Sequence, residues 1–144
     1  MANPLPTVGG DSGSWGTKLN AFLGTEHNAL DGYHTINSVS TVATSGAAQT
    51  LDLSTYGVFD ITLAEACILT FSNSSPSGKL SSFLLIIRQN LTGGYALTYP
   101  SSVVWDNGAA PTLTTTAGAI SVLSFFTTDG GTTWFGSLIS DNCS

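Results

Sequence analysis

The two histidines are the first residues to consider for chemistry, because imidazole can bind a metal ion or act as a general base. His27 and His34 lie close in sequence to three acidic residues, Asp11, Glu26 and Asp31. Neither histidine has the spacing of a metal motif such as H-E-x-x-H. Both fall in or just after a segment with helical periodicity, where an exposed polar face is the plainer interpretation. We predict no metal site and no histidine-based catalysis here.

Paired carboxylates are the next candidates, because glycoside hydrolysis needs two acids that project into one cleft. Asp52, Asp60 and Glu65 are scattered along the chain. Asp52 and Asp60 alternate with apolar neighbours, as solvent-facing strand positions do. The sequence therefore predicts no catalytic residue, and it indicates no cofactor.

The segment TTDGGTTW, residues 127–134, resembles the Asp box of sialidases and other repeat propellers. A propeller needs several copies of this motif, and the chain has one. A sialidase site also needs a cluster of arginines, whereas Arg88 is the only arginine. We therefore interpret the segment as a tight hairpin in which Asp129 accepts hydrogen bonds from turn amides and Trp134 folds onto the hairpin.

The composition excludes several classes of partner. Three cationic residues stand against nine carboxylates, a net charge of -6, so a phosphate-binding surface for nucleic acid is not expected. The longest apolar run, residues 83–87, is too short to cross a bilayer, and no leader is recognised, so we expect a soluble protein made in the cytoplasm and no membrane partner. Cys67 and Cys143 have no C-x-x-C spacing, and Cys67, in an apolar run, is expected to be a buried free thiol.

Charged residues are only 8% of the chain and hydrophobic residues 42%, while the sequence contains 19 Ser and 20 Thr. An ordinary globular domain has roughly 25% charged residues. Small hydroxyl side chains thus fill surface positions where Lys and Glu are usual. This composition favours a component of a larger coat over a freely diffusing catalyst.

The elements that must position these residues begin with an N-terminal region, residues 1–34. Residues 1–10 carry two prolines and a Gly-Gly pair without periodicity, which predicts an extended arm. A short helix should follow and stop at Asp31-Gly32. Its apolar positions form one stripe, which we predict to be an anchor or oligomer interface: Trp15, Leu19, Phe22, Leu23 and Leu30.

From residue 35 to 144 the period changes to two, and turn clusters recur every 8–12 residues, which predicts an all-β domain with a β-sandwich or jelly-roll-like fold. The predicted strands lie near 35–43, 49–54, 57–63, 67–72, 82–89, 95–99, 102–105, 112–115, 118–127 and 133–140. Residues 82–89 and 118–127 are apolar on both faces, so each should be a central strand, with a partner subunit supplying part of the cover. Gly93-Gly94 is interpreted as a hairpin turn.

Residues 100–111 form the longest irregular stretch, and they contain Trp105. An aromatic residue in such a place has three interpretations: a core residue, a contact between subunits, or a platform for a ligand. The sequence leaves all three open.

Several segments together resemble a β-domain that recurs in the small virion proteins of tailed bacteriophages, including head-decoration, head-fibre and tail-fibre proteins. The first is PTVGGDSGSWGTKLNAFLGTEHNALDGYH, with the pattern P-x-x-G-x-D-x-x-x-W-G-x-x-L-N. The others are LDLSTYGVFDITLAEACILTFSN and the run from LLIIRQNLTGG to TTDGGTTW. The resemblance implies a β-rich fold, a place in the virion and an oligomer, commonly a trimer.

We therefore expect a non-enzymatic capsid decoration (cement) protein, a homotrimer bound to the major capsid protein on the outside of a phage head. The alternative is a short tail-fibre or tail-tip protein that binds a host receptor, with Trp105 facing a glycan. A carbohydrate-active enzyme is a third, less favoured class. The N-terminal stripe would pack on the capsid lattice or on sister subunits, or it would cap its own domain.

Overall fold

The computed structural model describes residues 38–143, without the side chain of Asn107. The predicted arm and helix, both histidines and the boundary at residue 34 lie outside the described residues. The same holds for the whole predicted anchor stripe: Trp15, Leu19, Phe22, Leu23 and Leu30.

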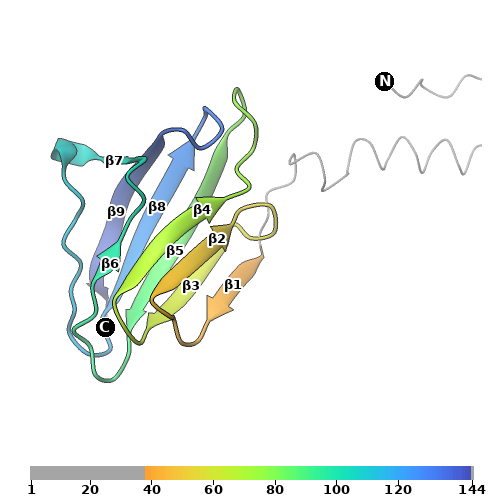
Figure 1. Cartoon of the computed structure of the whole chain (residues 1–144). Coiled ribbons are helices and arrows are strands. Elements are labelled where there is room, and N and C mark those ends of the chain that lie inside the picture. The colour runs from red at the N-terminus through yellow and green to blue at the C-terminus, as the bar shows by residue number, and fades with distance from the viewer. Residues whose placement is uncertain (1–37, 144) are drawn as a thin grey trace, which may run out of the picture. The chain divides into compact units, whose positions relative to one another are not determined.

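The described residues form nine strands and one 3-10 turn, η2 (Asp106–Gly108) (Figure 1). The strands are β1 (Val39–Val42), β2 (Ala48–Asp52), β3 (Val58–Leu63), β4 (Cys67–Ser72), β5 (Ser81–Gln89), β6 (Leu97–Thr98), β7 (Val103–Trp105), β8 (Ile120–Thr127) and β9 (Trp134–Cys143). The all-β prediction is thus confirmed for this part of the chain.

The strands belong to two sheets that lie in two layers (Figure 1). The larger sheet has the order β1-β3-β5-β8-β9-β7, and the smaller has the order β2-β4-β6. From β1 to β6, successive strands alternate between the two sheets, and the parallel pairs are β1 with β3, β2 with β4, β3 with β5 and β4 with β6. Strands β5, β8 and β9 then pair antiparallel, and β7 joins β9 in parallel.

This mixed topology differs from the antiparallel pairing that period-two sequences most often adopt. The chain from β1 to β6 winds as a two-sheeted coil, and β8 with β9 forms a conventional hairpin against it. The sandwich or jelly-roll description stays a prediction, while the positions of the two central strands are confirmed. Strands β5 and β8, which were expected at the centre, are the third and fourth of the six.

Alternation along the strands explains why the two sheets share one core. In β3 the side chains of Phe59, Ile61 and Leu63 are buried, while those between them are half-exposed. The inward residues of both sheets form a single cluster. At its centre the ring of Phe71, from the smaller sheet, makes edge contacts with three buried aromatic rings of the larger one: Phe83, Phe125 and Trp134.

The turn between β8 and β9 confirms the hairpin predicted for residues 127–134. Gly130 and Gly131 both have positive φ, 78° and 85°, which a tight turn requires here. Asp129 accepts hydrogen bonds from the backbone N–H of Thr133 and from the hydroxyl of Thr127. Trp134 is 2% exposed, so its ring belongs to the core rather than to the hairpin surface.

Gly93-Gly94 was predicted to close a hairpin, and this prediction is wrong. Both residues have positive φ and do form a turn, but it carries the chain from β5 in one sheet to β6 in the other. A Cβ at Gly93 would lie 2.6 Å from the backbone O of Thr115 and from the backbone N of Ala117. The glycine is therefore required by the close approach of another segment.

The strand predicted at 112–115 is also absent from the described residues. This segment is irregular, and the carboxylate of Asp141 at the end of β9 holds it in place. The hydroxyl and the backbone N–H of Thr114 both donate to that carboxylate, the hydroxyl at 2.7 Å. A side chain thus satisfies backbone groups that a strand neighbour would otherwise satisfy.

Candidate assembly face

The side of the larger sheet that points away from the core carries an apolar surface, which we call the outer face. Its members follow from the register, because residues that pair across strands share a side. Ser82 pairs with Phe126, Phe126 pairs with Phe135, and Val104 pairs with Phe135. The apolar residues of the outer face are Val39, Val58, Leu84, Ile86, Val104, Ile120, Val122, Phe126 and Phe135.

A stacked aromatic pair stands out on this outer face. The rings of Phe126 and Phe135 are 5.0 Å apart between centroids and nearly parallel, at 19°. Phe126 is 44% exposed and Phe135 46%. Val104 on one side and Leu84 on the other are exposed to a similar extent. Contiguous exposed apolar side chains are a feature of surfaces that other proteins cover, so this row is a candidate for such a contact.

Charge on the outer face is confined to one ion pair among the described strand residues. The guanidinium of Arg88 donates two hydrogen bonds to the carboxylate of Asp60, 2.7 Å from Nε to Oδ1 and 3.0 Å from Nη2 to Oδ2. The hydrogen bond from the guanidinium to Asp60 is also the main cause that raises the pKa of Arg88. The pair is bidentate and neutral, so the outer face has no net charge in a chain whose net charge is -6.

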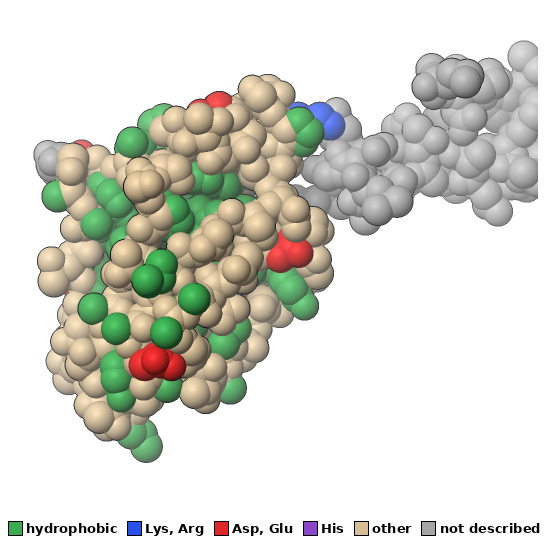
Figure 2. All heavy atoms as spheres, viewed as in Figure 1, with side chains coloured by type: hydrophobic (Ala, Val, Ile, Leu, Met, Phe, Trp, Pro, Cys, Tyr) green, Lys and Arg blue, Asp and Glu red, His purple; other side chains and the backbone are tan. Residues whose placement is uncertain are grey.

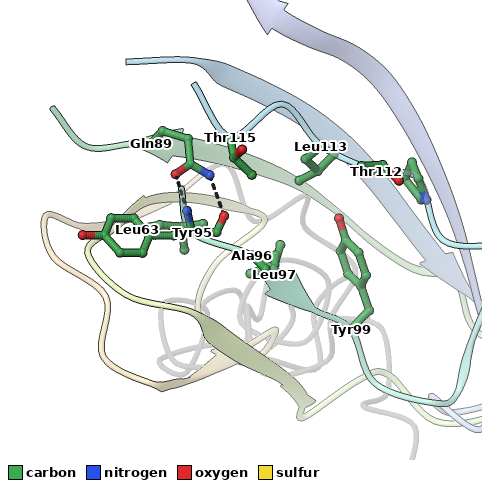
Figure 3. Close-up of a pocket in the computed structure, with 10 residues that line it drawn as sticks. Leu63, Gln89, Tyr95, Ala96, Leu97, Tyr99, Thr112, Leu113 and Thr115 are labelled. Carbon is green, nitrogen blue, oxygen red and sulfur yellow. Dashed lines mark hydrogen bonds between the residues drawn. The ribbon is translucent and has the colours of Figure 1, made fainter. Parts of the chain in front are cut away.

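A recess of about 250 Å³ opens near one end of the core (Figure 3). The side-chain amide of Gln89 donates to the backbone carbonyl of Tyr95 and accepts from its N–H, so that amide is already engaged. Figure 3 shows both bonds, with Tyr99 at the other end of the recess. The hydroxyl oxygen of Tyr99 is buried and has no hydrogen-bond partner among the described residues. This burial raises the pKa of the Tyr99 hydroxyl group.

Trp105 lies at the edge of the core, while its two other predicted interpretations, a contact between subunits and a platform for a ligand, stay predictions. Its ring packs edge-on against Tyr99 and Phe125, at 4.6 and 5.6 Å between centroids, and is only partly buried. On its accessible side it lines a second hollow of about 290 Å³, together with Asp106, Ala109, Pro111, Ser137 and Leu138. The side chain is therefore both a boundary of the core and a surface residue.

Two further carboxylates of the described residues are engaged in local structure. Asp52 accepts from the hydroxyl of Ser54 and from the amide of Asn73, and these bonds lower its pKa. Asp141 accepts from Ser121 and Thr114, which lowers its pKa. Within residues 38–143, no group of three or more His, Cys, Asp or Glu side chains is placed to hold a metal ion.

The general character of the surface follows the composition. On the side of the molecule that Figure 2 shows, neutral and apolar side chains predominate and charged ones are few. Across the part of the chain that the structure describes, no helix is long and apolar enough to cross a membrane.

Sequence reasoning found part of this site and missed part. Residues 118–127 were predicted to be apolar on both faces, and the structure places Leu123 and Phe125 in the core and Ile120, Val122 and Phe126 on the outer face. Phe135 was not singled out, although its position next to the hairpin turn was a usable signal. Comparisons with family models, with curated proteins and with solved structures each find no match.

Proposed function

We propose that this protein is a structural component of a phage virion, a capsid decoration protein that binds the outside of the head and stabilises the lattice. The observation that carries the proposal is the outer face, a sheet surface with exposed and half-exposed apolar side chains among serines, whose only described strand charges cancel as the Asp60–Arg88 pair. Desolvating such a surface costs little, and burying its apolar side chains against another protein is favourable.

The proposal assigns assembly, rather than catalysis, to this chain, because four of its carboxylates are engaged within the fold. Asp52, Asp60, Asp129 and Asp141 each accept hydrogen bonds from neighbouring strands or turns. Carboxylates used in this way hold loops in place and are poorly suited to exchange protons with a substrate. The chain would thus act through its shape and its contacts, with copies that associate with one another and together bridge neighbouring capsid subunits.

Many copies make such a mechanism effective. A contact of modest affinity becomes strong when it is repeated around an oligomer, because each further contact forms at high effective concentration. We propose a homotrimer on the major capsid protein, with the N-terminal stripe as the anchor, in line with the phage proteins that the sequence resembles. We also keep the sandwich description as a proposal, supported by the single core that the two sheets share.

The second candidate is a short tail-fibre or tail-tip protein that binds a host receptor. The hollow beside Trp105 favours it, because an indole, the carboxylate of Asp106 and the hydroxyl of Ser137 line one surface depression. Saccharides bind to such combinations of an aromatic ring and hydrogen-bonding groups. A Trp105→Ala variant would then lose binding to host cells.

Copy number decides between the two candidates. Purified virions that contain the protein are resolved by quantitative gel analysis and by imaging at side-chain resolution. Hundreds of copies on the head support decoration, while a few copies at the tail support receptor binding. Purified protein that binds no assembled particle, at any concentration used, overturns both.

A further inference from the structure

We propose that the outer face of the larger sheet is a contact between copies of this chain, with the stacked Phe126–Phe135 pair at its centre. The inference deepens the proposed function and rests on it for its biological role, since a decoration protein acts as an oligomer. The contact itself can be tested without any virus particle.

Charge is the first reason to name a second copy as the occupant. Two copies that each carry a net charge of -6 repel one another, so they can meet only where acidic charge is absent. On the outer face the only described strand charges, Asp60 and Arg88, neutralise each other at 2.7 Å. A strongly charged partner would find no complementary group on this face, whereas an identical apolar face is complementary to it.

Area is the second reason. Six strands about 4.8 Å apart, with about six residues each at 3.3 Å, give a face of about 600 Å². Two such faces together bury about 1,200 Å², the lower limit for a stable specific interface. A single contact of this kind is sufficient for an oligomer and leaves the smaller sheet and the Trp105 hollow free for other partners.

The chemistry of the row is the third reason. Val104, Phe135 and Phe126 follow one another across β7, β9 and β8, and the next position in the row is Ser82 of β5. Leu84 lies two residues further along β5. Exposed aromatic and aliphatic surfaces pack against one another at interfaces between identical subunits, and copies of the same row can meet around the threefold axis of the proposed trimer.

The first test is sedimentation of the full-length chain and of two variants, Phe126→Glu and Phe135→Glu. Both side chains are nearly half exposed in a single copy, so glutamate should be tolerated by the fold, which circular dichroism verifies. The wild type is expected to sediment as an oligomer, and each variant as a folded monomer with a dissociation constant raised by about 100-fold or more. Ile68→Glu, on the outward side of β4, is the matched control and should remain oligomeric.

A second test locates the contact directly. Ser124→Cys, two residues from Phe126 on the same side, is placed in a Cys143→Ser background and treated with a short bismaleimide. Covalent dimers are expected from this variant and not from Thr70→Cys on the outward side of β4. The inference is overturned by a monomeric wild type, by Phe126→Glu chains that stay oligomeric, or by dissociation in Phe22→Glu alone, which would assign the contact to the N-terminal segment.

The same samples separate this inference from the proposed function. If the wild type is an oligomer through the outer face but binds no phage particle, the inference stands and decoration fails. If the wild type binds particles but never self-associates, decoration stands and the inference fails.

Discussion

The carboxylate of Asp129 accepts hydrogen bonds from the backbone N–H of Thr133, at 2.9 Å to Oδ1 and 3.1 Å to Oδ2. These bonds close the turn between β8 and β9, the two strands that carry Phe126 and Phe135. The bond from the Thr133 N–H is also the main cause that lowers the pKa of Asp129.

This relationship gives a pH prediction. A carboxyl whose pKa is lowered on folding stabilises the protein above its ordinary pKa of 3.8, and that stability is lost as the pH falls through the lower folded value. Asp129→Asn should therefore have a lower Tm than the wild type at neutral pH. The difference in Tm between the two proteins should become smaller below pH 3.8. The pKa of Asp52 and of Asp141 is also lowered, so these two groups add a pH dependence that the wild type and the variant share. The measured quantity is therefore the difference in Tm between the two proteins at each pH. An equal gap at all pH values contradicts the prediction.

Gly136 should not tolerate a side chain. A Cβ there would lie 2.7 Å from the ring of Trp105 and 3.0 Å from that of Phe125. We expect Gly136→Ala to displace the indole, to alter tryptophan fluorescence and to cost about 1–3 kcal/mol of unfolding free energy in urea titrations. Gly46→Ala is the control, since nothing lies within 4 Å of its added Cβ. Adding Trp105→Val to Gly136→Ala should recover part of the loss.

The ion pair on the outer face gives a test of charge balance. Asp60→Asn leaves Arg88 without its partner, and Arg88→Gln leaves Asp60 without its own, so each single variant buries an uncompensated charge in the proposed contact. We expect each to weaken self-association by about 10-fold or more, and the double variant to associate like the wild type. Sedimentation equilibrium measures all four proteins. A double variant that self-associates more weakly than both single variants would contradict this prediction, because it would show that the ion pair itself contributes to the contact.

The two cysteines should differ in reactivity. Cys67 is buried and free, and burial, with a smaller contribution from the charge of Glu65, raises the pKa of its thiol. Cys143 is half-buried and also free. Because the thiolate is the reactive form, iodoacetamide should label Cys143 in the native protein and Cys67 about 100-fold or more slowly. Mass spectrometry of the peptides measures both rates, and equal rates would contradict the structure.

Strand positions were predictable from the sequence because period-two patterns report which side of a strand is buried. The pattern of Phe59, Ile61 and Leu63 requires only that one side face a core, and the structure agrees. The pairing of strands was not predictable in the same way. Val58 pairs with Leu84 in parallel, and nothing in either local sequence distinguishes that partner from an antiparallel one.

Errors arose where tertiary contacts replaced local rules. Gly93-Gly94 has the composition of a hairpin turn, but it is the close approach of Thr115 and Ala117 that requires glycine at position 93. Residues 112–115 alternate like a strand, yet Asp141 binds Thr114 and no strand neighbour is needed. Residues 118–127 indicated only part of the outer face. The strand register was needed to place Phe135 and Val104 on it.

The parallel winding from β1 to β6 relates the size of this part of the fold to the number of times the chain passes through both sheets. Val39 pairs with Val58, and Val58 pairs in turn with Leu84, so the circuits stack one on another, and only the last of them, through β5, also pairs with β8. A duplicated circuit would add one rung of about 4.8 Å without disturbing the β8–β9 hairpin. The extent of this part of the fold is therefore set by the number of circuits, in steps of one strand spacing.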